Sequence, residues 1–472
     1  MLRPGSLGRM STPSIDGWSS DRTYRQALRS LRREHSFEPL RVVGTVPEEL
    51  RGTLYRAGPG LFESFGRAYS HPFEADGAVT AVRFGAGRVE GGVQVVQSAG
   101  LRAEAARGKS LYGSPAPWWR RFVGGLRQDV KNTGNTAILP WQGRVFALME
   151  AAKPTEIDPR TLATLGETTL DVVTGGFSAH PKRIPARETT YNFGMQYGPK
   201  PALSLYALPD RGPARRLTQV PLPHNAMVHD FACTETTALF LVAPVELVLW
   251  RAILQIGGFS DFFRWDSRLD TRLIAVPLDD PDRRSTVELD PLWVWHFGNA
   301  FDDAGRVVVD MSRYSDFTSL DAIAAEDDGQ AETGKLVRAV VDLAAGSATF
   351  EQLDDAMAEF PVVHPEFRGR RHAATWTVHD RGLARFDHAA GTLDVHPVPA
   401  HCLATEPVFV PRRGGGETDG WILTLVLDAE ADRSRLTVLD AAHMEREPVA
   451  EAWFDQPLPV TFHGAWMDDS VG

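Results

Sequence analysis

The sequence has little cysteine, no excess of positive charge and no long apolar run. Its two cysteines, Cys233 and Cys402, are far apart and form no C-x-x-C pair, so neither a disulfide framework nor a thiolate metal site is indicated. We expect both to be buried apolar thiols. The formal net charge is −11, and no run of Lys and Arg with interleaved aromatics is present, which makes nucleic acid an unsuitable partner.

The absence of a long apolar run also bears on location. No stretch reaches the ~18 apolar residues that span a membrane, and the first ten residues, MLRPGSLGRM, lack the apolar core of a signal peptide. We therefore expect a cytosolic protein. With 472 residues, 43% of them hydrophobic, the chain can bury a large core, and its 32 prolines and 42 glycines indicate many turns.

The pattern of apolar residues divides the chain near residue 37. Within residues 21–35, helical spacing is seen for Tyr24, Leu28 and Leu31. We predict an N-terminal extension over residues 1–37 that contains a short amphipathic helix. One large domain follows over residues 38–472.

This large domain consists of short alternating apolar segments broken by Gly, Asp and Pro, which is typical of strands and hairpins. Three Gly-Arg-Val triplets, beginning at Gly87, Gly143 and Gly305, each start a new apolar run. A glycine that supplies a positive φ before a β-former favours a hairpin. Because no βαβ alternation is present, the repeated hairpins favour an all-β β-propeller.

Two segments interrupt the strand pattern, at residues 111–126 and 245–259. Both carry more Trp, Phe, Leu and Ile than a polar loop should. In the first, aromatic residues stand beside Arg120 and Arg121, which is the mixture found at a lipid interface. Two interpretations stay open: both segments pack on the propeller as loops, or they lie together and touch a membrane.

Four of the 14 histidines end or interrupt apolar, strand-like runs: His180, His229, His296 and His463. Any one of them alone is best explained as a hydrogen-bonded core histidine, but four such residues favour a metal site assembled from several blades. Nine others lie in polar, Pro-, Gly- or Arg-rich settings where we expect surface or turn positions: His35, His71, His364, His372, His379, His388, His396, His401 and His443.

The remaining histidine, His224, stands five residues before His229 in PHNAMVHDF. In an extended segment side chains alternate between faces, so these two should point in opposite directions. His229, between Val228 and Phe231, is the inward candidate.

Three acids lie in unusually apolar strands: Glu150, Glu359 and Glu406. A metal-bound imidazole normally gives its second N–H to a carboxylate, so these acids match the histidine set. All-imidazole ligation suits Fe, Zn, Cu or Ni and does not decide among them.

The motifs around these residues identify a family. They include RGTLYRAGPG (51–60), HPFEADGAV (71–79), NTAILPWQGRVFALME (135–150), MVHDF (227–231), HFGNAF (296–301), EPVFVPR (406–412) and FHGAW (462–466). In order and spacing they resemble the carotenoid cleavage oxygenases, a family of non-haem iron enzymes. The resemblance runs from about residue 38 to the C-terminus.

The resemblance implies a seven-bladed propeller with Fe(II) on its axis, capped on one face by helical and loop insertions. It implies that His180, His229, His296 and His463 hold the metal and that Glu150, Glu359 and Glu406 orient the last three of them, in that order. His180 is then without a carboxylate partner. Thr136 is similar to a family residue whose methyl group crowds an open coordination position. The implied reaction splits a C=C bond of a carotenoid or apocarotenoid, with O2 as co-substrate, and the two insertions then lie at the tunnel mouth.

Two other functions stay open: cleavage of a stilbene or phenylpropenoid, and a silent propeller that binds an apolar ligand. In relatives that act on phenols, a Lys precedes the glutamate that aligns with Glu150. Here Met149 stands there, and a thioether suits a polyene better than a phenol. Lys131 is the nearest alternative cation, and its polar setting predicts a surface position. The departure FEADG, at Phe73 to Gly77, is expected to form a turn.

Overall fold

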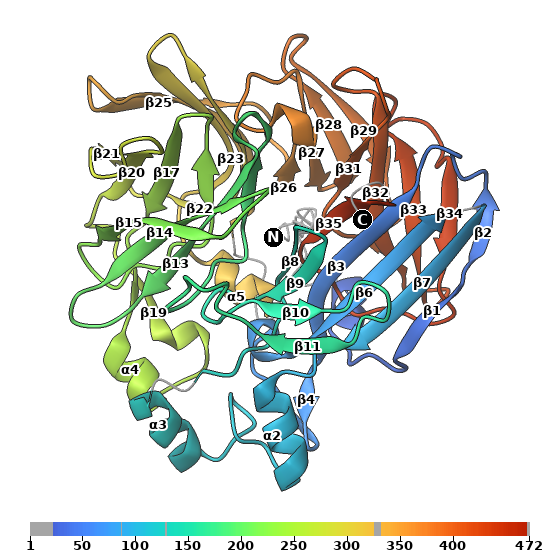
Figure 1. The fold of residues 1–472 in the computed structure, drawn as a ribbon, viewed down its shortest axis with the longest axis horizontal. Helices are drawn as coiled ribbons and strands as arrows, with labels where there is room; N and C mark the ends of the chain where they lie inside the picture. Colours follow the sequence, from blue (N-terminus) through green and yellow to red (C-terminus); the bar gives the residue numbers. More distant parts are fainter. Residues whose placement is uncertain (1–21, 86, 128–129, 325–331, 470–472) are drawn as a thin grey trace, which may run out of the picture.

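The computed structural model describes residues 22–85, 87–127, 130–324 and 332–469, and its strands form seven antiparallel sheets of four to six strands around one centre (Figure 1). The blades are numbered in the order in which their main strands occur along the chain. Blade 1 has β1 (His35–Pro39), β3 (Gly52–Leu61), β6 (Asp76–Gly85), β7 (Arg88–Val95) and β35 (Gly464–Asp468); blade 2 has β8 (Ala137–Trp141), β9 (Arg144–Leu148), β10 (Thr155–Ile157) and β11 (Thr164–Glu167).

The next blades repeat this four-stranded pattern. Blade 3 has β12 (Lys182–Ile184), β13 (Thr189–Gln196), β14 (Ala202–Pro209) and β15 (Arg215–Pro221); blade 4 has β16 (Phe231–Cys233), β17 (Thr237–Val242), β20 (Thr271–Pro277) and β21 (Ser285–Leu289). Blade 5 has β22 (Trp293–Asp303), β23 (Arg306–Tyr314), β24 (Lys335–Asp342) and β25 (Ser347–Gln352); blade 6 has β26 (Ala358–Val362), β27 (Ala374–His379), β28 (Gly382–Asp387) and β29 (Thr392–Pro397).

Blade 7 closes the ring and joins the two ends of the chain. It has β2 (Arg41–Gly44), β30 (Cys402–Ala404), β31 (Val408–Pro411), β32 (Gly420–Asp428), β33 (Arg433–Asp440) and β34 (Ala450–Trp453). Strand β2 pairs with β34, and β35 pairs with β3, so N-terminal and C-terminal strands share two blades. The expectation of a seven-bladed all-β propeller is confirmed.

The hairpins form where the Gly-Arg-Val triplets predict them. Gly87, Gly143 and Gly305 have φ values of 75°, 74° and 83°, and β7, β9 and β23 each begin at the arginine that follows. Residues with a Cβ rarely adopt such values, so glycine is the residue that makes these turns without strain.

The hydrophobic core lies between neighbouring blades. Every residue of β17 is buried, and its Leu239 and Leu241 belong to one cluster with Val307 and Val309 of β23 in the next blade. Where a sheet is covered on both faces, a middle strand can be buried along its whole length, as β17 is. Cys233 and Cys402 are both free and buried, as expected.

The inner edges of the blades form the axis. Strands β12, β16, β22 and β26 contact one another in that order, and β31, β35 and β8 do the same. These are edge strands of their sheets. Side chains at their first residues therefore meet at the centre of the molecule.

Helices and small hairpins are confined to insertions. They are α1 (Arg22–Ala27), α2 (Ala99–Arg107), α3 (Trp118–Arg127), α4 (Leu249–Leu254), α5 (Ser319–Ile323), η1 (Pro72–Glu74), η2 (Pro185–Arg187), η3 (Ser260–Phe262), η4 (Pro365–Phe367), β4 (Glu63–Ser64), β5 (Arg67–Ala68), β18 (Val245–Leu247) and β19 (Phe263–Trp265). Helices α2, α3 and α4 project together from one side of the ring (Figure 1). No helix in the described ranges is both long and apolar enough to cross a bilayer.

The N-terminal helix is shorter than the apolar spacing predicts. It ends at Ala27, whose carbonyl accepts the N–H of Val460, and the N–H of Leu31 bonds the carbonyl of Gly60. Backbone pairing with the propeller therefore replaces the later helical turns. Tyr24 is fully buried against Val460 and Phe462, so this helix packs on the body.

Candidate metal centre

Four imidazoles meet on the propeller axis because four inner strands deliver them there. His180 and His229 stand two residues before β12 and β16, His296 lies in β22, and His463 directly precedes β35. The ring centroid of His180 lies 4.3, 5.4 and 4.7 Å from those of His229, His296 and His463. The centroid of His296 lies 5.4 Å from that of His229 and 4.9 Å from that of His463. We call these four residues the histidine quartet.

Three glutamates orient three members of the quartet. The Nδ1 atom of His296 lies 2.5 Å from Oε2 of Glu359, and Nδ1 of His463 lies 2.8 Å from Oε1 of Glu406. Nδ1 of His229 is paired with Oε1 of Glu150. In each case the carboxylate holds Nδ1, which leaves Nε2 as the ligand atom.

His180 differs from the other three. Its Nε2 lies 3.8 Å from Oε1 of Glu150, beyond hydrogen-bond distance. The ligand atoms of His180, His296 and His463 lie within 4.8 Å of one another, as do those of Glu150, His180 and His229. His180 thus belongs to both groups and connects them.

The surroundings keep the imidazoles in the form that binds metal. Burial, followed by the nearby His229 and His463, holds the pKa of His180 well below 6.5. Burial and His463 do the same for the pKa of His296. A neutral imidazole offers a lone pair, which an imidazolium does not.

The pKa values of two of the glutamates are shifted in opposite directions. Burial raises the pKa of Glu359 to about 7, although the hydroxyl of Tyr314 donates to its Oε1 over 2.6 Å. Burial also acts to raise the pKa of Glu406, but His463 and the buried Arg56 outweigh it and hold this pKa below its ordinary value. The two carboxyls therefore differ in the pH at which they lose a proton.

Three buried nitrogen atoms of the quartet make no hydrogen bond within the described residues. One is Nδ1 of His229, which has only the ion-pair contact with Glu150, and the other two are Nε2 of His180 and Nε2 of His296. A buried polar atom without a hydrogen bond costs free energy, and a metal ion bound between the four imidazoles would satisfy both Nε2 atoms. The donor set is all imidazole nitrogen, so the quartet fits a first-row transition metal such as Fe(II).

A cavity of about 1670 Å³ is lined by residues of α3 and α4 and by residues that contact the quartet. Its wall includes Thr136, Met149 and Glu150, and the apolar side chains of Phe73, Met195, Met227 and Phe259. The backbone carbonyl of Thr136 accepts the N–H of His463 over 3.1 Å, and Glu150 is paired with His229, so both wall residues lie next to the quartet. The cavity, which also has apolar walls, therefore reaches the residues that hold two of the four histidines.

His224 lies outside the quartet, in line with the parity argument, but for another reason. Residues 224–230 are not a strand, apart from an isolated bridge between Ala226 and Glu246. His224 lines the cavity instead of facing the axis. The strand-alternation premise was wrong, although the choice between the two histidines agrees with the structure.

Five histidines expected at surface or turn positions are buried: His35, His71, His364, His372 and His379. For His71 and His364 the turn role holds, because their Nδ1 atoms accept the N–H groups of Phe73 and Glu366 at the start of η1 and η4. His372 is buried because Asp310, from another strand, lies 2.7 Å from its Nε2. The acid that pairs with such a histidine is distant in the sequence, so the local sequence does not predict that the histidine is buried.

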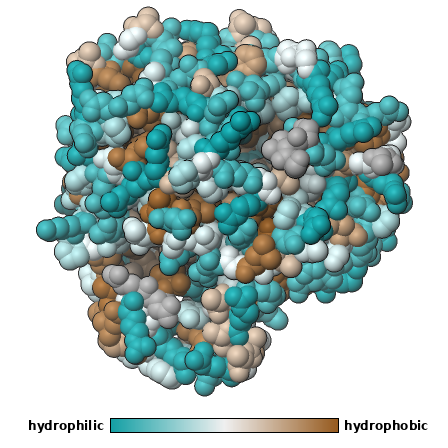
Figure 2. Space-filling model, viewed as in Figure 1, coloured by the Kyte–Doolittle hydropathy of each residue, from teal (hydrophilic) through white to brown (hydrophobic). Residues whose placement is uncertain are grey.

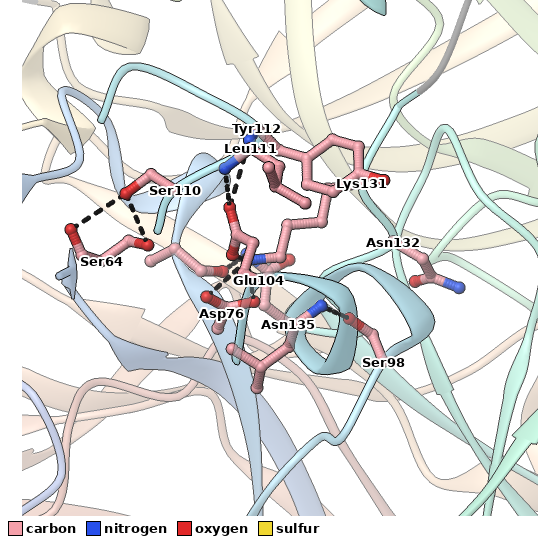
Figure 3. Close-up of polar contacts among 12 residues, drawn as sticks. Ser64, Asp76, Ser98, Glu104, Ser110, Leu111, Tyr112, Lys131, Asn132 and Asn135 are labelled. Carbon is pink, nitrogen blue, oxygen red and sulfur yellow. Dashed lines mark hydrogen bonds and ion pairs between the residues drawn. The ribbon is translucent and has the colours of Figure 1, made fainter. Parts of the chain in front are cut away.

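Lys131 was predicted to lie on the surface and is buried, so that prediction is wrong. Figure 3 shows its ammonium group between Asp76 and Glu104, at distances of 2.6 and 2.7 Å. It also donates to the hydroxyl of Tyr69 over 3.1 Å. All three N–H donors of Lys131 are therefore used within the protein.

This ion cluster also fixes the wall of the cavity. Oε1 of Glu104 accepts the N–H groups of Leu111 and Tyr112 over 2.7 and 3.1 Å (Figure 3). The predicted turn at Phe73 to Gly77 is present as η1, but Asp76 lies beyond it in β6 and belongs to the cluster. The cluster thus anchors the segment that leads into α3.

The two apolar insertions lie together, as predicted. Indole Nε1 of Trp118 donates to the carbonyl of Leu254 over 3.2 Å, and α3 packs on α4. Trp118, Trp119 and Trp250 are each more than half exposed. Apolar residues show at the lower edge of the molecule over α4 in Figure 2, and Leu249, Ala252 and Ile253 of this helix line the cavity.

The sequence patterns did not predict a functional role for several residues around the metal-binding centre. Asp230 and Arg56 stand inside quoted motifs, and both are buried charges near the quartet. Tyr314 of β23 contacts Glu359, and no pattern in the local sequence predicts this contact. Phe360 has a φ of 53° and stacks on His296 with centroids 4.5 Å apart. Such backbone strain is most often found at functional sites.

Comparison with known proteins shows similarity over nearly the whole chain. A family model described as retinal pigment epithelial membrane protein matches residues 28–468. The chain is 31% identical to the apocarotenoid-15,15'-oxygenase of Synechocystis sp., over 90% of this chain and 92% of that protein. It is 29% identical to lignostilbene-alpha,beta-dioxygenase isozyme III of Sphingomonas paucimobilis, over 94% and 96%.

Among solved structures, the fold is similar to the crystal structure of cobalt-substituted Synechocystis apocarotenoid oxygenase. The TM-score is 0.88 at 30% identity, and the match covers 94% of this chain and 98% of the other. The name of that structure states that it is cobalt-substituted, and the imidazole nitrogens of the quartet described above suit a first-row transition metal.

Proposed function

The chain belongs to the retinal pigment epithelial membrane protein family, the carotenoid cleavage oxygenases, and is an alkene-cleaving oxygenase; we propose that it uses Fe(II) to split an apocarotenoid. The observation that carries the metal proposal is the quartet itself. Four imidazoles converge, three are paired with carboxylates, and the Nε2 atoms of His180 and His296 are buried without a hydrogen bond in the described part of the chain.

In this proposal His180, His229, His296 and His463 are the metal ligands, and Glu150, Glu359 and Glu406 hold the last three in the correct tautomer. Fe(II) held by neutral ligands supplies the activation of O2 for addition to an electron-rich C=C bond, which is split into two carbonyl products. The protein contributes geometry and a dry cavity. No side chain needs to move a proton.

The cavity wall supports a polyene as the substrate. Thr136 and Met149 would face the substrate beside the metal, and Phe73, Met195 and Phe259 offer apolar contacts further out. An extended polyene needs a long apolar compartment and few hydrogen bonds. The similarity to an apocarotenoid oxygenase points to the same class.

A phenolic stilbene is the second candidate, because the chain is also similar to a lignostilbene dioxygenase. Met149 offers no charge to a phenol, and Lys131 cannot replace it because Asp76, Glu104 and Tyr69 use its donors. A buried phenol without a partner would cost about 1–3 kcal/mol. This term favours the apocarotenoid.

The apolar surface of α3 and α4 completes the proposal. A polyene that leaves a bilayer should not cross water, and exposed tryptophans with neighbouring arginines suit the interface. Trp118, Trp119 and Trp250 are exposed on α3 and α4 in this way, and Trp119 also lines the cavity. We therefore include peripheral membrane contact through these two helices.

The test uses protein expressed in iron-supplemented medium. Iron content is measured first, and then an apocarotenal and a 4-hydroxystilbene are each incubated with the enzyme and O2. We expect about one iron per chain and aldehyde products from the apocarotenal, identified by mass spectrometry. Faster turnover of the stilbene would overturn the substrate choice, and metal-free protein that binds apolar ligands would indicate a silent propeller.

A further inference from the structure

One buried carboxylate outside the quartet connects three of the four segments that carry it. Asp230 directly follows His229, and its Oδ2 accepts the N–H of Phe297, the residue after His296, over 2.8 Å. The same carboxylate receives Nζ of Lys182, two residues after His180, over 2.9 Å. Its Oδ1 accepts the N–H of Phe231 over 2.7 Å.

Asp230 therefore bonds the main chain and one lysine, not an imidazole. Lys182 also donates to the carbonyl of Phe297 over 3.4 Å, so both charged residues reach the same point of β22. Only 3% of Asp230 is exposed, so its carboxylate is shielded from water, whereas the side chain of Lys182 is 23% exposed. Hydrogen bonds to a charged group are the stronger kind.

Asp230 and Lys182 lie beside the quartet, where small displacements of the backbone would move the proposed metal ligands. A metal centre works only if its ligands stay within about 0.5 Å of their required positions. His180, His229 and His296 come from three different blades, and the inner strands β12, β16 and β22 are short or irregular at these points. Much of the contact between the blades is apolar packing, which does not define direction as a hydrogen bond does, and the hydrogen bond from Ser178 to the carbonyl of His229 is long, at 3.4 Å.

We propose that Asp230, together with Lys182, is a positioning residue of the metal centre that fixes the backbones carrying His180, His229 and His296 relative to one another. The proposal rests on the metal-binding function proposed above. It predicts that Asp230 acts on metal affinity and geometry, without being a ligand. Because Lys182 balances its charge, the effect is geometric and adds no net charge beside the metal.

The alternative is an ordinary structural ion pair. The same propeller offers a matched control, because Asp310 is a fully buried carboxylate that receives Nε of Arg338 over 2.7 Å and Nε2 of His372 over 2.7 Å. Its partners follow no member of the quartet. Asp310 also belongs to a separate group with His372 and His388 whose ligand atoms lie within 4.8 Å of one another. Loss of either carboxylate should lower stability, but only loss of Asp230 should change the cobalt affinity and absorption bands of the quartet.

The test compares Asp230→Asn, Lys182→Met and the control Asp310→Asn, each prepared without metal. Co²⁺ is titrated in, the dissociation constant is measured by chelator competition, and the visible absorption bands report ligand geometry. For Asp230→Asn we expect about 10- to 100-fold weaker cobalt binding with shifted bands. Lys182→Met should show a smaller loss in the same direction, and Asp310→Asn should change only the melting temperature.

The outcomes separate the two proposals. Parent protein that binds cobalt, with Asp230→Asn equal to it in affinity and spectrum, would overturn the positioning role and leave the metal centre intact. Parent protein that binds no cobalt or iron would overturn both. If Asp230→Asn does not accumulate as folded protein, Lys182→Met decides, and unchanged bands and affinity in that variant overturn the positioning role.

Discussion

At the scale of single residues, the centre depends on which nitrogen of each imidazole is free. The glutamates hold Nδ1 of His229, His296 and His463, so the opposite nitrogen faces the axis. Burial keeps His180 and His296 neutral at physiological pH. The ligand atoms are thus prepared before any metal arrives.

Removal of one imidazole should therefore empty the centre. His296→Ala is expected to reduce iron content to near zero and to abolish turnover, since one of the four proposed nitrogen ligands is removed. The matched change His224→Ala removes a histidine from the cavity wall and should leave iron content unchanged. Metal analysis of both purified proteins checks this, and normal iron content in His296→Ala would refute the ligand assignment.

Glu359 should also make the metal-free protein sensitive to pH. Its pKa is raised to about 7 in the folded chain from the ordinary 4.5, so the folded state binds this proton more tightly than the unfolded state. The resulting stability is fully present below about pH 4.5 and is lost as pH rises through about 7.

The measurement is the free energy of unfolding of metal-free protein at pH 5 and pH 8. The parent should lose more stability between these values than Glu359→Gln, which cannot take up the proton. Parallel behaviour of the two proteins would show that this carboxyl is already ionised at pH 5. Metal must be removed first, because a bound cation would change the pKa of the carboxyl.

At the scale of elements, α3 and α4 owe their position to polar anchors, not to their own helical tendency. Helix α4 has only six residues, too few to be stable alone. The cluster of Lys131, Asp76 and Glu104 fixes the chain before α3 and leaves the tryptophans free to face outward.

If these helices meet a membrane, a charge on them should weaken that contact. Trp119→Glu is expected to reduce sedimentation with liposomes several-fold, while turnover of detergent-solubilised apocarotenal stays within about twofold, on the order of the effect of a surface change. Val43→Glu, on the exposed strand β2, is the control and should bind liposomes as the parent does. Equal liposome binding by Trp119→Glu would exclude this surface.

At the scale of the whole molecule, closure of the ring and assembly of the centre are one event. Strand β35 pairs with β3, and His463 stands directly before β35. Arg56, fully buried in β3, donates to the carbonyls of Glu406 and Phe462 over 2.9 Å each. The first and last parts of the sequence therefore hold the last ligand in place together.

A substitution at Gly58 tests the link between closure of the ring and the position of His463. A Cβ at this position of β3 would overlap the carbonyl oxygen of Val460 and lie 2.6 Å from Cα of Thr461, just before His463. Gly58→Ala should lower the free energy of unfolding by about 1–3 kcal/mol, as overpacking does, and should reduce iron content. Gly85→Ala, whose nearest neighbour lies 3.8 Å away, should do neither. Calorimetry and metal analysis check both, and equal behaviour of the two variants would refute the link.

The sequence by itself determined the features that local patterns encode. Glycine before a β-former places hairpins at Gly87, Gly143 and Gly305, and imidazoles at the ends of apolar runs mark the residues that meet on the axis. The tertiary structure alone decided which charges are buried. Lys131 and His372 lie in short segments that look polar, Asp230 lies at the end of an apolar run, and each is buried beside partners from distant parts of the chain. A charge is buried only where a partner offsets its desolvation, and here only the folded ring brings those partners within reach.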